Sequence, residues 1–406
     1  MEPGFWSGVA AFSPDSESQT LFRHPRARRS VEPGVIVLTT TVAQDNRLME
    51  EALTLAARAV GRTSPNPLVG AVVVADGAVI GRGYHARAGE AHAEAIALTQ
   101  AGKRAEGATV YVTLEPCAHV GRTGPCTESL IAAGVRRVVV AMIDPDVKVH
   151  GKGIVRLRGA GIEVNVGLLE AQARRLNEFY VKHRTTGLPF VTLKWAMSLD
   201  GKIAADRGSA TAITGEAARR FAHELRNTYD VVLVGVQTVL ADDPQLTCRI
   251  PGGRNPQRVV LDSHLRTPMN ARVVKEAAEA RTLIVTAGVA PVDRIDALRR
   301  AGVEVLVQDH SGDRVRLRPL LQELGRRGLL SVLIEGGGTV NASAIAEGVV
   351  DKVIALIAPS LIGGAQAPTP LEGPGLVEVG GALRLRDVRV MQGLGEDVAI
   401  EGYLSV

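Results

Sequence analysis

The sequence has few aromatic residues, which make up only 3% of its 406 residues. Proteins that bind single-stranded nucleic acid stack the bases on aromatic side chains, so this scarcity argues against that class. The excess of positive charge is also small, with a net charge of +4, and it is dispersed along the chain. This excess is too weak and too dispersed to argue for a nucleic-acid partner, and a small anionic substrate or cofactor suits the composition better.

Cysteine is equally scarce. Cys117, Cys126 and Cys248 are the only three in the chain. They are too few for a disulfide framework, and they fit a reducing compartment. No uninterrupted apolar run is long enough to span a bilayer. We therefore expect a cytoplasmic protein with no membrane partner.

The first 42 residues differ from the rest of the chain. They contain the polar stretch "SPDSESQT" and the arginine cluster "FRHPRARRS". Acidic Glu2, Asp15 and Glu17 argue against a targeting peptide. We expect a disordered extension over residues 1–42, although a start codon assigned too early would also explain this segment.

From residue 45 onward, apolar strand patterns alternate with amphipathic helices and glycine turns, which indicates layered α/β architecture. Residues 45–60 carry an apolar helical stripe with Asp45 as the expected N-cap. Asp76-Gly77 predicts a tight turn between two short strands. A second unit begins after "HRTTGLP". We therefore predict one domain over residues 43–187 and another over residues 188–406.

The stretch "HAEAIAL", residues 92–98, places His92 and Glu94 at the start of a predicted helix. Taken alone, the pair is most simply a surface histidine and a surface glutamate. Downstream, however, the chain reads "TLEPCAHVGRTGPC", which adds Cys117 and Cys126. One imidazole and two thiolates are suitable ligands for zinc, and three protein ligands leave one position for water. Glu94 can then act as the general acid and base of a hydrolytic deaminase.

This arrangement matches the zinc-deaminase signature of His-x-Glu followed by Pro-Cys and a second Cys, with one difference. The cysteines stand nine positions apart, rather than three, and so enclose a loop. That loop carries Arg122 and Thr123, whose donors suit a phosphate group. A solvated basic loop is a fair alternative explanation for Arg122.

The chain resembles the bifunctional deaminase–reductase family of riboflavin biosynthesis. The deaminase half carries "SPNPLVGAVVV", "GYH", "HAEAIAL", "TLEPCAHVGRTGPC" and "DPDVKVHGKG". The other half carries "LKWAMSLDGKIA", "GVQTVLADDPQLTCR" and "LIEGGGTVNASA". The resemblance extends in the same order over nearly all of residues 45–406. It implies a cytidine-deaminase-like α/β/α zinc domain followed by a dihydrofolate-reductase-like α/β domain.

The resemblance also implies roles for residues of the deaminase domain. His92, Cys117 and Cys126 would bind one zinc ion, and Glu94 would be catalytic. The substrate would contact a further set of residues, namely Asn66, His85, His119, Arg122, Thr123 and Lys152. The family usually has Asn where this chain has Asp146, which puts a ligand contact from that position in doubt.

The second half lacks both a Rossmann fingerprint and a P-loop. "LIEGGGTVNAS" could hold a phosphate at a helix N-terminus, although an ordinary tight turn between a strand and a helix explains it equally simply. The resemblance implies NADPH binding by Thr238, Asp242, Gly336, Gly337, Gly338 and Thr339. It assigns Ser209, Arg226, Leu246, Arg249 and Glu335 to the substrate. Lys194 is a candidate for help at the reacting carbon, although an ordinary strand-end pair of Lys194 and Asp200 beside a turn explains it about equally well.

The expected enzyme hydrolyses the C2 amino group of a phosphorylated ribosylaminopyrimidine and then reduces the ribosyl chain with NADPH. We expect a homo-oligomer with a small-molecule substrate and no nucleic-acid partner. The family commonly has Trp in a Ser-x-Trp-Ile-Thr stretch, whereas Ala212 precedes Ile213 here. A deaminase with a degenerate reductase domain is therefore an open alternative. A nucleic-acid-editing deaminase and a non-catalytic binding protein are further alternatives.

Overall fold

The computed structural model describes residues 33–118, 124–208, 212–288, 290–308, 312–375 and 378–404. The chain divides into two compact units, Met1–Thr185 and Thr186–Val406. The elements of the first unit are α1 (Pro33–Ala57), β1 (Gly70–Ala75), β2 (Ala78–Tyr84), α2 (Ala93–Ala101), η2 (Gly102–Ala105), β3 (Thr109–Val112), α3 (Cys126–Ala132), β4 (Arg137–Val140), α4 (Lys152–Gly159), β5 (Glu163–Val166), α5 (Glu170–Leu176) and α6 (Glu178–Thr186).

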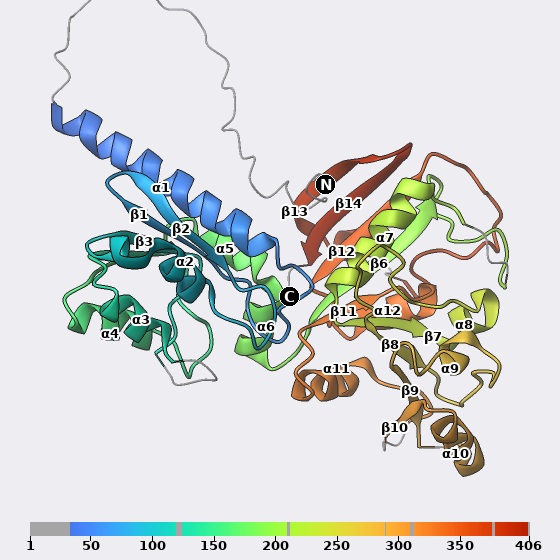
Figure 1. The fold of residues 1–406 in the computed structure, drawn as a ribbon. Coiled ribbons are helices and arrows are strands. Elements are labelled where there is room, and N and C mark those ends of the chain that lie inside the picture. Colours follow the sequence, from blue (N-terminus) through green and yellow to red (C-terminus); the bar gives the residue numbers. More distant parts are fainter. Residues whose placement is uncertain are drawn as a thin grey trace, which may run out of the picture. The chain divides into compact units, whose positions relative to one another are not determined.

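The first unit is a five-stranded sheet in the order β2-β1-β3-β4-β5. The first two neighbouring pairs are antiparallel and the last two are parallel. Alternate residues of β1 face opposite sides of the sheet, as the strand repeat requires. Ala71 and Val73 pack with α2, α3 and α4, whereas Val72 and Val74 pack with α1 and α5. The unit therefore has three α/β/α layers (Figure 1).

Two local predictions had different outcomes. Asp76 and Gly77 both adopt positive φ, at 50° and 74°, and connect β1 to β2 as the Asp-Gly pair predicts. The N-cap prediction for Asp45 is wrong, because α1 already begins at Pro33. Asp45 lies inside this helix and instead pairs with Arg137, which donates to its carboxylate at 2.8 Å. The extension expected over residues 1–42 lies mostly outside the described residues.

The second unit is built on a larger sheet. Its elements are β6 (Phe190–Ser198), α7 (Glu216–Thr228), β7 (Val231–Gly235), α8 (Val236–Asp242), β8 (Gln257–Leu261), α9 (Arg272–Lys275), β9 (Thr282–Ala287), α10 (Val292–Arg300), β10 (Glu304–Gln308), α11 (Leu317–Arg326), β11 (Ser331–Ile334), α12 (Gly338–Ala346), β12 (Lys352–Ala358), η3 (Val379–Gly381), β13 (Leu385–Leu394) and β14 (Asp397–Leu404).

Nine strands form this sheet in the order β10-β9-β8-β7-β11-β6-β12-β14-β13. Strand β14 is antiparallel to both of its neighbours, and the other neighbouring pairs are parallel. Helices α11 and α12 contribute to the apolar core on one face, and α8, α9 and α10 to the core on the other. Open sheets of this kind bind ligands beyond the carboxyl ends of their parallel strands.

Candidate functional site

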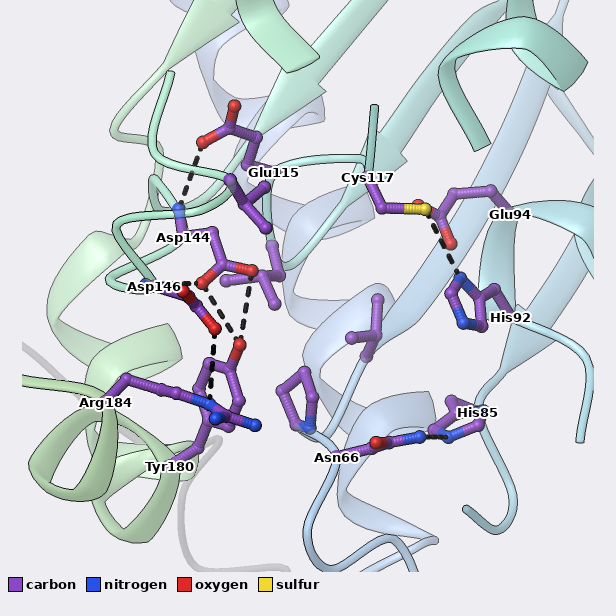
Figure 2. Close-up of a pocket in the computed structure, with 14 residues that line it drawn as sticks. Asn66, His85, His92, Glu94, Glu115, Cys117, Asp144, Asp146, Tyr180 and Arg184 are labelled. Atoms are coloured by element: carbon purple, nitrogen blue, oxygen red, sulfur yellow. Dashed lines mark hydrogen bonds and ion pairs between the residues drawn. The ribbon is translucent and has the colours of Figure 1, made fainter. Parts of the chain in front are cut away.

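The structure brings His92, Cys117 and Cys126 together in the first unit. Figure 2 shows His92 and Cys117. His92 immediately precedes α2, Cys117 lies in the loop after β3, and Cys126 is the first residue of α3. The Nδ1 atom of His92 lies 3.2 Å from the Cys126 sulfur and 3.7 Å from the Cys117 sulfur. All three candidate ligand atoms lie within 4.8 Å of one another. Residues 34 positions apart in the sequence thus form one compact donor set.

The chemistry of this donor set fits zinc. One imidazole nitrogen and two sulfurs match its preferred ligands, and three ligands leave a coordination position for water. Hydrogen bonding from the Cys126 thiol, with a further contribution from His92, lowers the pKa of the Cys117 thiol to about 4. The thiolate form is the one that binds a metal. Cys117 is therefore already disposed toward the ligating form.

Glu94 occupies the first turn of α2, two residues after His92, and lines the same cavity as His92 and Cys117. Its side chain is buried, and burial raises the pKa of its carboxyl group. A carboxyl group that holds its proton more readily than in water is suited to general acid–base work. The arrangement can therefore activate a water molecule and protonate a leaving amine.

The cavity has a volume of about 200 Å³ and brings together several of the predicted residues. Asn66 and His85 line it beside His92 and Glu94, with Asn66 Nδ2 3.0 Å from His85 Nε2. Burial lowers the pKa of His85, which favours its neutral form. A neutral imidazole and an amide can bind the polar edge of a flat heterocycle.

Other predicted residues are placed differently. Lys152 is not among the residues that line this cavity, and its Nζ atom donates a hydrogen bond to the backbone oxygen of Lys148 at 2.8 Å. His119, Arg122 and Thr123 lie outside the described residues. The cavity also has lining residues that the motifs did not indicate, namely Glu115, Asp144, Asp146, Tyr180 and Arg184.

Glu115 illustrates why such residues were missed. Its carboxylate accepts hydrogen bonds from the backbone N–H groups of Gly151 and Gly153, at 2.9 and 2.8 Å, and from Asp144 at 3.2 Å. A carboxylate two residues before Cys117 thus fixes the start of α4, 36 or more residues away. A carboxylate at a helix N-terminus is favourable. The only signal in the sequence was its place inside "LEPC".

The second unit holds a cluster of charged side chains at the carboxyl end of β11. Glu335, the residue after β11, accepts hydrogen bonds from Arg226 Nε and Nη2 at 2.8 Å each, and from Lys194 Nζ at 3.1 Å. All three side chains are mostly buried. Burial alone would raise the pKa of Glu335, but the two cations outweigh burial and hold the pKa below its usual range. Three residues expected at the reductase site therefore lie together.

Two further residues adjoin this cluster. The backbone N–H of Arg249 donates to His223 Nδ1 at 3.3 Å. Burial, together with nearby Arg226 and Arg249, lowers the pKa of His223 to about 4. His223 is therefore neutral at pH 7 and can accept this hydrogen bond. The sequence analysis did not indicate His223, because a lone histidine on a helix gives no motif.

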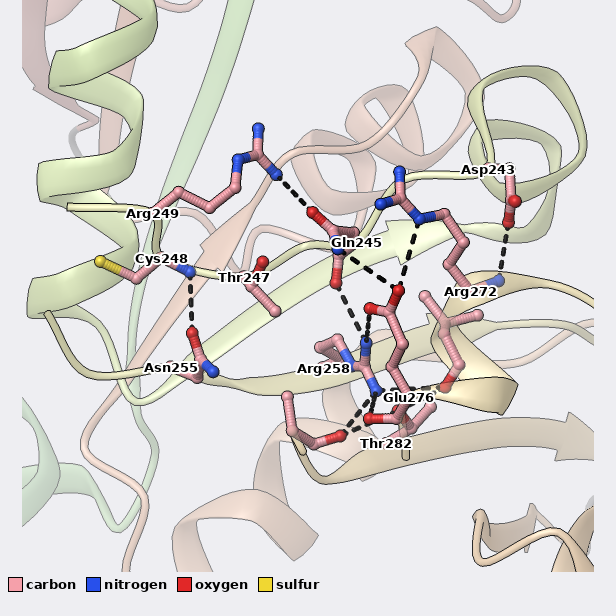
Figure 3. A network of polar contacts seen from close by, with 12 residues as sticks. Asp243, Gln245, Thr247, Cys248, Arg249, Asn255, Arg258, Arg272, Glu276 and Thr282 are labelled. Atoms are coloured by element: carbon pink, nitrogen blue, oxygen red, sulfur yellow. Dashed lines mark hydrogen bonds and ion pairs between the residues drawn. The ribbon is translucent and has the colours of Figure 1, made fainter. Parts of the chain in front are cut away.

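The loop between α8 and β8 carries Leu246 and Arg249. Figure 3 shows Arg249 with its polar neighbours. Leu246 is buried and adopts a left-handed φ of 57°. Such a conformation is unfavourable for a non-glycine residue unless its surroundings hold it. The side chain of Gln245 accepts a hydrogen bond from Arg249 Nη1 and donates one to Glu276, each at 3.3 Å. Arg258 also donates to the backbone oxygen of Gln245 at 3.1 Å.

The residues expected to bind a cofactor lie on two elements. Thr238 and Asp242 belong to α8, Gly336 and Gly337 precede α12, and Gly338 and Thr339 are its first two residues. A Cβ atom on Gly338 would lie 2.4 Å from the backbone oxygen of Thr369, so this close approach requires glycine. Thr339 donates a hydrogen bond to Glu372 at 3.3 Å. Ser209 lies outside the described residues.

Comparison with known proteins identifies the two units. Residues 189–400 match the RibD C-terminal domain, and residues 42–142 match the cytidine and deoxycytidylate deaminase zinc-binding region. Riboflavin biosynthesis protein RibD from Synechocystis is 45% identical over 365 residues, which cover 89% of this chain and 96% of that protein. The chain belongs to the RibD family.

Solved structures of RibD proteins agree with this assignment. Acinetobacter baumannii RibD, form 1, is 39% identical with a TM-score of 0.81, covering 90% of this chain and 100% of that one. A Thermotoga maritima structure is named as a diaminohydroxyphosphoribosylaminopyrimidine deaminase/5-amino-6-(5-phosphoribosylamino)uracil reductase. It is 36% identical, with a TM-score of 0.78 and the same coverage of both chains.

The expected bifunctional deaminase–reductase of riboflavin biosynthesis is thereby confirmed. The expected fold, an α/β deaminase domain followed by an α/β reductase domain, is confirmed as well. The deaminase family and the His/Cys/Cys cluster indicate a metal, and the reductase domain indicates a nucleotide cofactor. None of the helices in the described ranges combines the length and apolar character that a bilayer crossing requires.

Proposed function

We propose that the first unit deaminates 2,5-diamino-6-ribosylamino-4(3H)-pyrimidinone 5′-phosphate, and that the second unit reduces the ribosyl chain of the product with NADPH. The observation that carries the proposal is the His92, Cys117 and Cys126 cluster, which shares one cavity with buried Glu94. The name of the Thermotoga maritima relative specifies this pair of substrates for that protein. In this proposal the enzyme is a cytoplasmic homo-oligomer. It binds one zinc ion per chain and has no nucleic-acid partner.

In the deaminase reaction, His92, Cys117 and Cys126 hold the zinc ion, which supplies Lewis-acid activation of water when bound. Asn66 and His85 orient the pyrimidine ring within the cavity. Glu94 takes a proton from the attacking water and delivers it to the amine that leaves C2. The carbon gains oxygen as its bond to nitrogen breaks, so water and the amino group become a carbonyl and ammonia.

In the reductase reaction, NADPH supplies a hydride when bound to the residues around α8 and the Gly336–Thr339 turn. Arg226 and Arg249 hold the anionic end of the substrate, and Leu246 and Ser209 are further proposed substrate contacts. Glu335 meets sugar hydroxyls, and Lys194 stands at the reacting carbon. Glu335 fixes both cations at once, because its carboxylate bonds Arg226 and Lys194. Preorganised charge of this kind costs little rearrangement during the reaction.

A second candidate function is a deaminase whose reductase domain is inactive. The observation that favours it is Ala212, which stands where the family commonly has Trp near the cofactor, and which is exposed. An NADPH titration separates the two candidates. Saturable binding supports the bifunctional enzyme, whereas absence of binding supports the deaminase alone.

The direct test supplies the diaminopyrimidine phosphate and NADPH to purified protein with intact thiols. We expect ammonia release, NADPH oxidation and about one zinc ion per chain by metal analysis. Ammonia without NADPH oxidation would leave only the deaminase. Protein without zinc, or without ammonia release, would contradict the deaminase assignment. Size-exclusion chromatography tests the predicted homo-oligomer in the same preparation.

A further inference from the structure

The deaminase cavity is lined by four carboxyl groups and one guanidinium group, although its proposed substrate is phosphorylated. Among its 14 lining residues are Glu94, Glu115, Asp144 and Asp146. Arg184 is the only Lys or Arg in this lining set, all of which lies within the described residues. Like charges close together are unfavourable, and the effect grows as water is excluded. The placement of this single cation therefore bears on which substrates can enter.

Three of the four carboxylates accept hydrogen bonds from backbone N–H groups or from a tyrosine hydroxyl. Glu115 accepts hydrogen bonds from backbone N–H groups at the start of α4. Asp144 accepts from the Tyr180 hydroxyl at 3.1 Å and from the backbone N–H of Asp146 at 2.8 Å. Glu94 has its role at the candidate metal centre. Asp146 accepts a hydrogen bond through Oδ1 from the backbone N–H of Lys148 at 2.9 Å, and its other oxygen, Oδ2, is the one that lies near a cation.

Asp146 and Arg184 both line the cavity, and their side chains point toward each other (Figure 2). The Oδ2 atom of Asp146 lies 3.6 Å from Arg184 Nε, which is an ion pair without a hydrogen bond. The guanidinium carbon of Arg184 also lies 5.0 Å from the centre of the Tyr180 ring, a cation–π distance. Both side chains of the pair are partly buried, with 31% of Arg184 and 22% of Asp146 exposed. The last helix of the first unit, α6, thus supplies the counter-charge for Asp146.

We propose that Arg184 is a specificity-determining residue of the deaminase pocket. It offsets the charge of Asp146, so that the pocket accepts an anionic, phosphorylated pyrimidine. The inference rests on the proposed deaminase function. An uncharged asparagine at position 146 would need no such counter-charge, so the aspartate and the arginine act as a matched pair.

The test compares the deaminase kinetics of Arg184→Gln, Asp146→Asn and the double variant. Each is assayed by ammonia release with the phosphorylated substrate and with its dephosphorylated counterpart. We expect Arg184→Gln to raise KM for the phosphorylated substrate about tenfold, because an uncompensated carboxylate then repels it. For the dephosphorylated substrate, KM should rise by less than about threefold. The value of kcat should stay near that of the wild type.

The double variant carries the decisive result. It should return KM to within about twofold of the wild type, since removing Asp146 removes the charge that Arg184 offsets. A double variant as impaired as Arg184→Gln would overturn the inference, because Arg184 would then contact the phosphate itself. An unchanged KM in Arg184→Gln, or an equal loss of kcat with both substrates, would overturn it too.

Arg174→Gln is the matched control. Arg174 forms an exposed i,i+4 ion pair with Glu170 on α5 and does not line the cavity. It should leave KM unchanged for both substrates. Zinc content near one per chain in each variant checks that the deaminase unit has folded. Wild-type protein that releases no ammonia would refute the proposed function and this inference with it, whereas an active wild type with an unaffected Arg184→Gln would refute the inference alone.

Discussion

The two units assemble their charged clusters over very different sequence distances. In the deaminase unit, His92 and Cys126 are 34 positions apart, and their motifs are short and contiguous. In the reductase unit, Glu335 meets Arg226 from 109 positions away and Lys194 from 141. The metal ligands could therefore be predicted from their spacing in the sequence. The reductase cluster could not, because it forms only when β6, α7 and β11 pack together.

The two buried carboxylates also differ in their electrostatics. Burial raises the pKa of Glu94, whereas Arg226 and Lys194 outweigh burial and lower the pKa of Glu335. The first environment suits a group that picks up and releases a proton, and the second suits a group that stays ionised. The comparison predicts that removing the charge of Glu94 lowers deaminase activity, whereas removing that of Glu335 lowers reductase activity and stability.

The largest expected effect is on Glu94. Replacing Glu94 with alanine should reduce ammonia release by about 10²- to 10⁴-fold, because the general acid–base group is removed. Reduction of pre-deaminated substrate should stay within about twofold of the wild type, since Glu94 belongs only to the deaminase cavity. A parallel loss of ammonia release and of reduction in Glu94→Ala would contradict the assignment of Glu94 to the deaminase site alone. Zinc content should remain near one per chain, because Glu94 is not a ligand in the proposed site.

Glu335→Gln should produce the converse pattern and also destabilise the protein. Two mostly buried cations lose their shared counter-charge, and breaking a buried ion pair by removing one partner costs about 3–5 kcal/mol. Urea unfolding should show this loss, and the reductase should be strongly impaired while ammonia release persists. Adding Lys194→Met should recover part of the stability, because one stranded cation is then removed, but it should not recover reduction. Full stability in Glu335→Gln would contradict the proposed electrostatic design.

Much of the fold follows from local patterns in the sequence. The Asp76-Gly77 turn and the alternation of strands with helices were both predictable, because turn chemistry and periodicity are local. Asp45 shows the limit of this reasoning. Asp is a good helix cap in isolation, but here it sits inside α1 and pairs with Arg137, 92 positions away.

The site was predictable where chemistry requires a short motif, and was missed where packing supplies the group. Tyr180 and Arg184 lie on α6, and nothing in that helix marks them as residues of a cavity built mainly from earlier elements. Arg258 is similar, since no motif marks it, yet it is fully buried in a strand. Tertiary contacts, which a single sequence does not display, determine these three placements.

Arg258 gives the third prediction, which extends the comparison to the loop that carries Arg249. Its guanidinium donates hydrogen bonds to the backbone oxygens of Gln245, Glu276 and Ala280, at 3.1, 2.8 and 2.6 Å. Arg258→Met should leave these acceptors unsatisfied, at a cost of about 3 kcal/mol in urea unfolding. We also expect a raised reductase KM with unchanged deaminase kinetics. Arg258→Lys should recover only part of the loss, because an ammonium cannot match the planar fork.

The smallest expected effect concerns the Arg82–Glu51 ion pair, whose N–O distance is shorter than that of the Lys194–Glu335 pair. Arg82 Nε lies 2.5 Å from Glu51 Oε1, against 3.1 Å for Lys194 Nζ and Glu335 Oε2. Yet 48% of Arg82 and 32% of Glu51 is exposed, compared with 11% of Lys194 and 7% of Glu335.

Because water and salt screen exposed charges, Arg82→Gln should change the free energy of unfolding by about 0.5 kcal/mol and leave both activities intact. The difference in unfolding free energy between Arg82→Gln and the wild type should be smaller at high salt than at low salt. A loss as large as that of Glu335→Gln would mean that contact distance, and not burial, sets the strength of ion pairs in this protein.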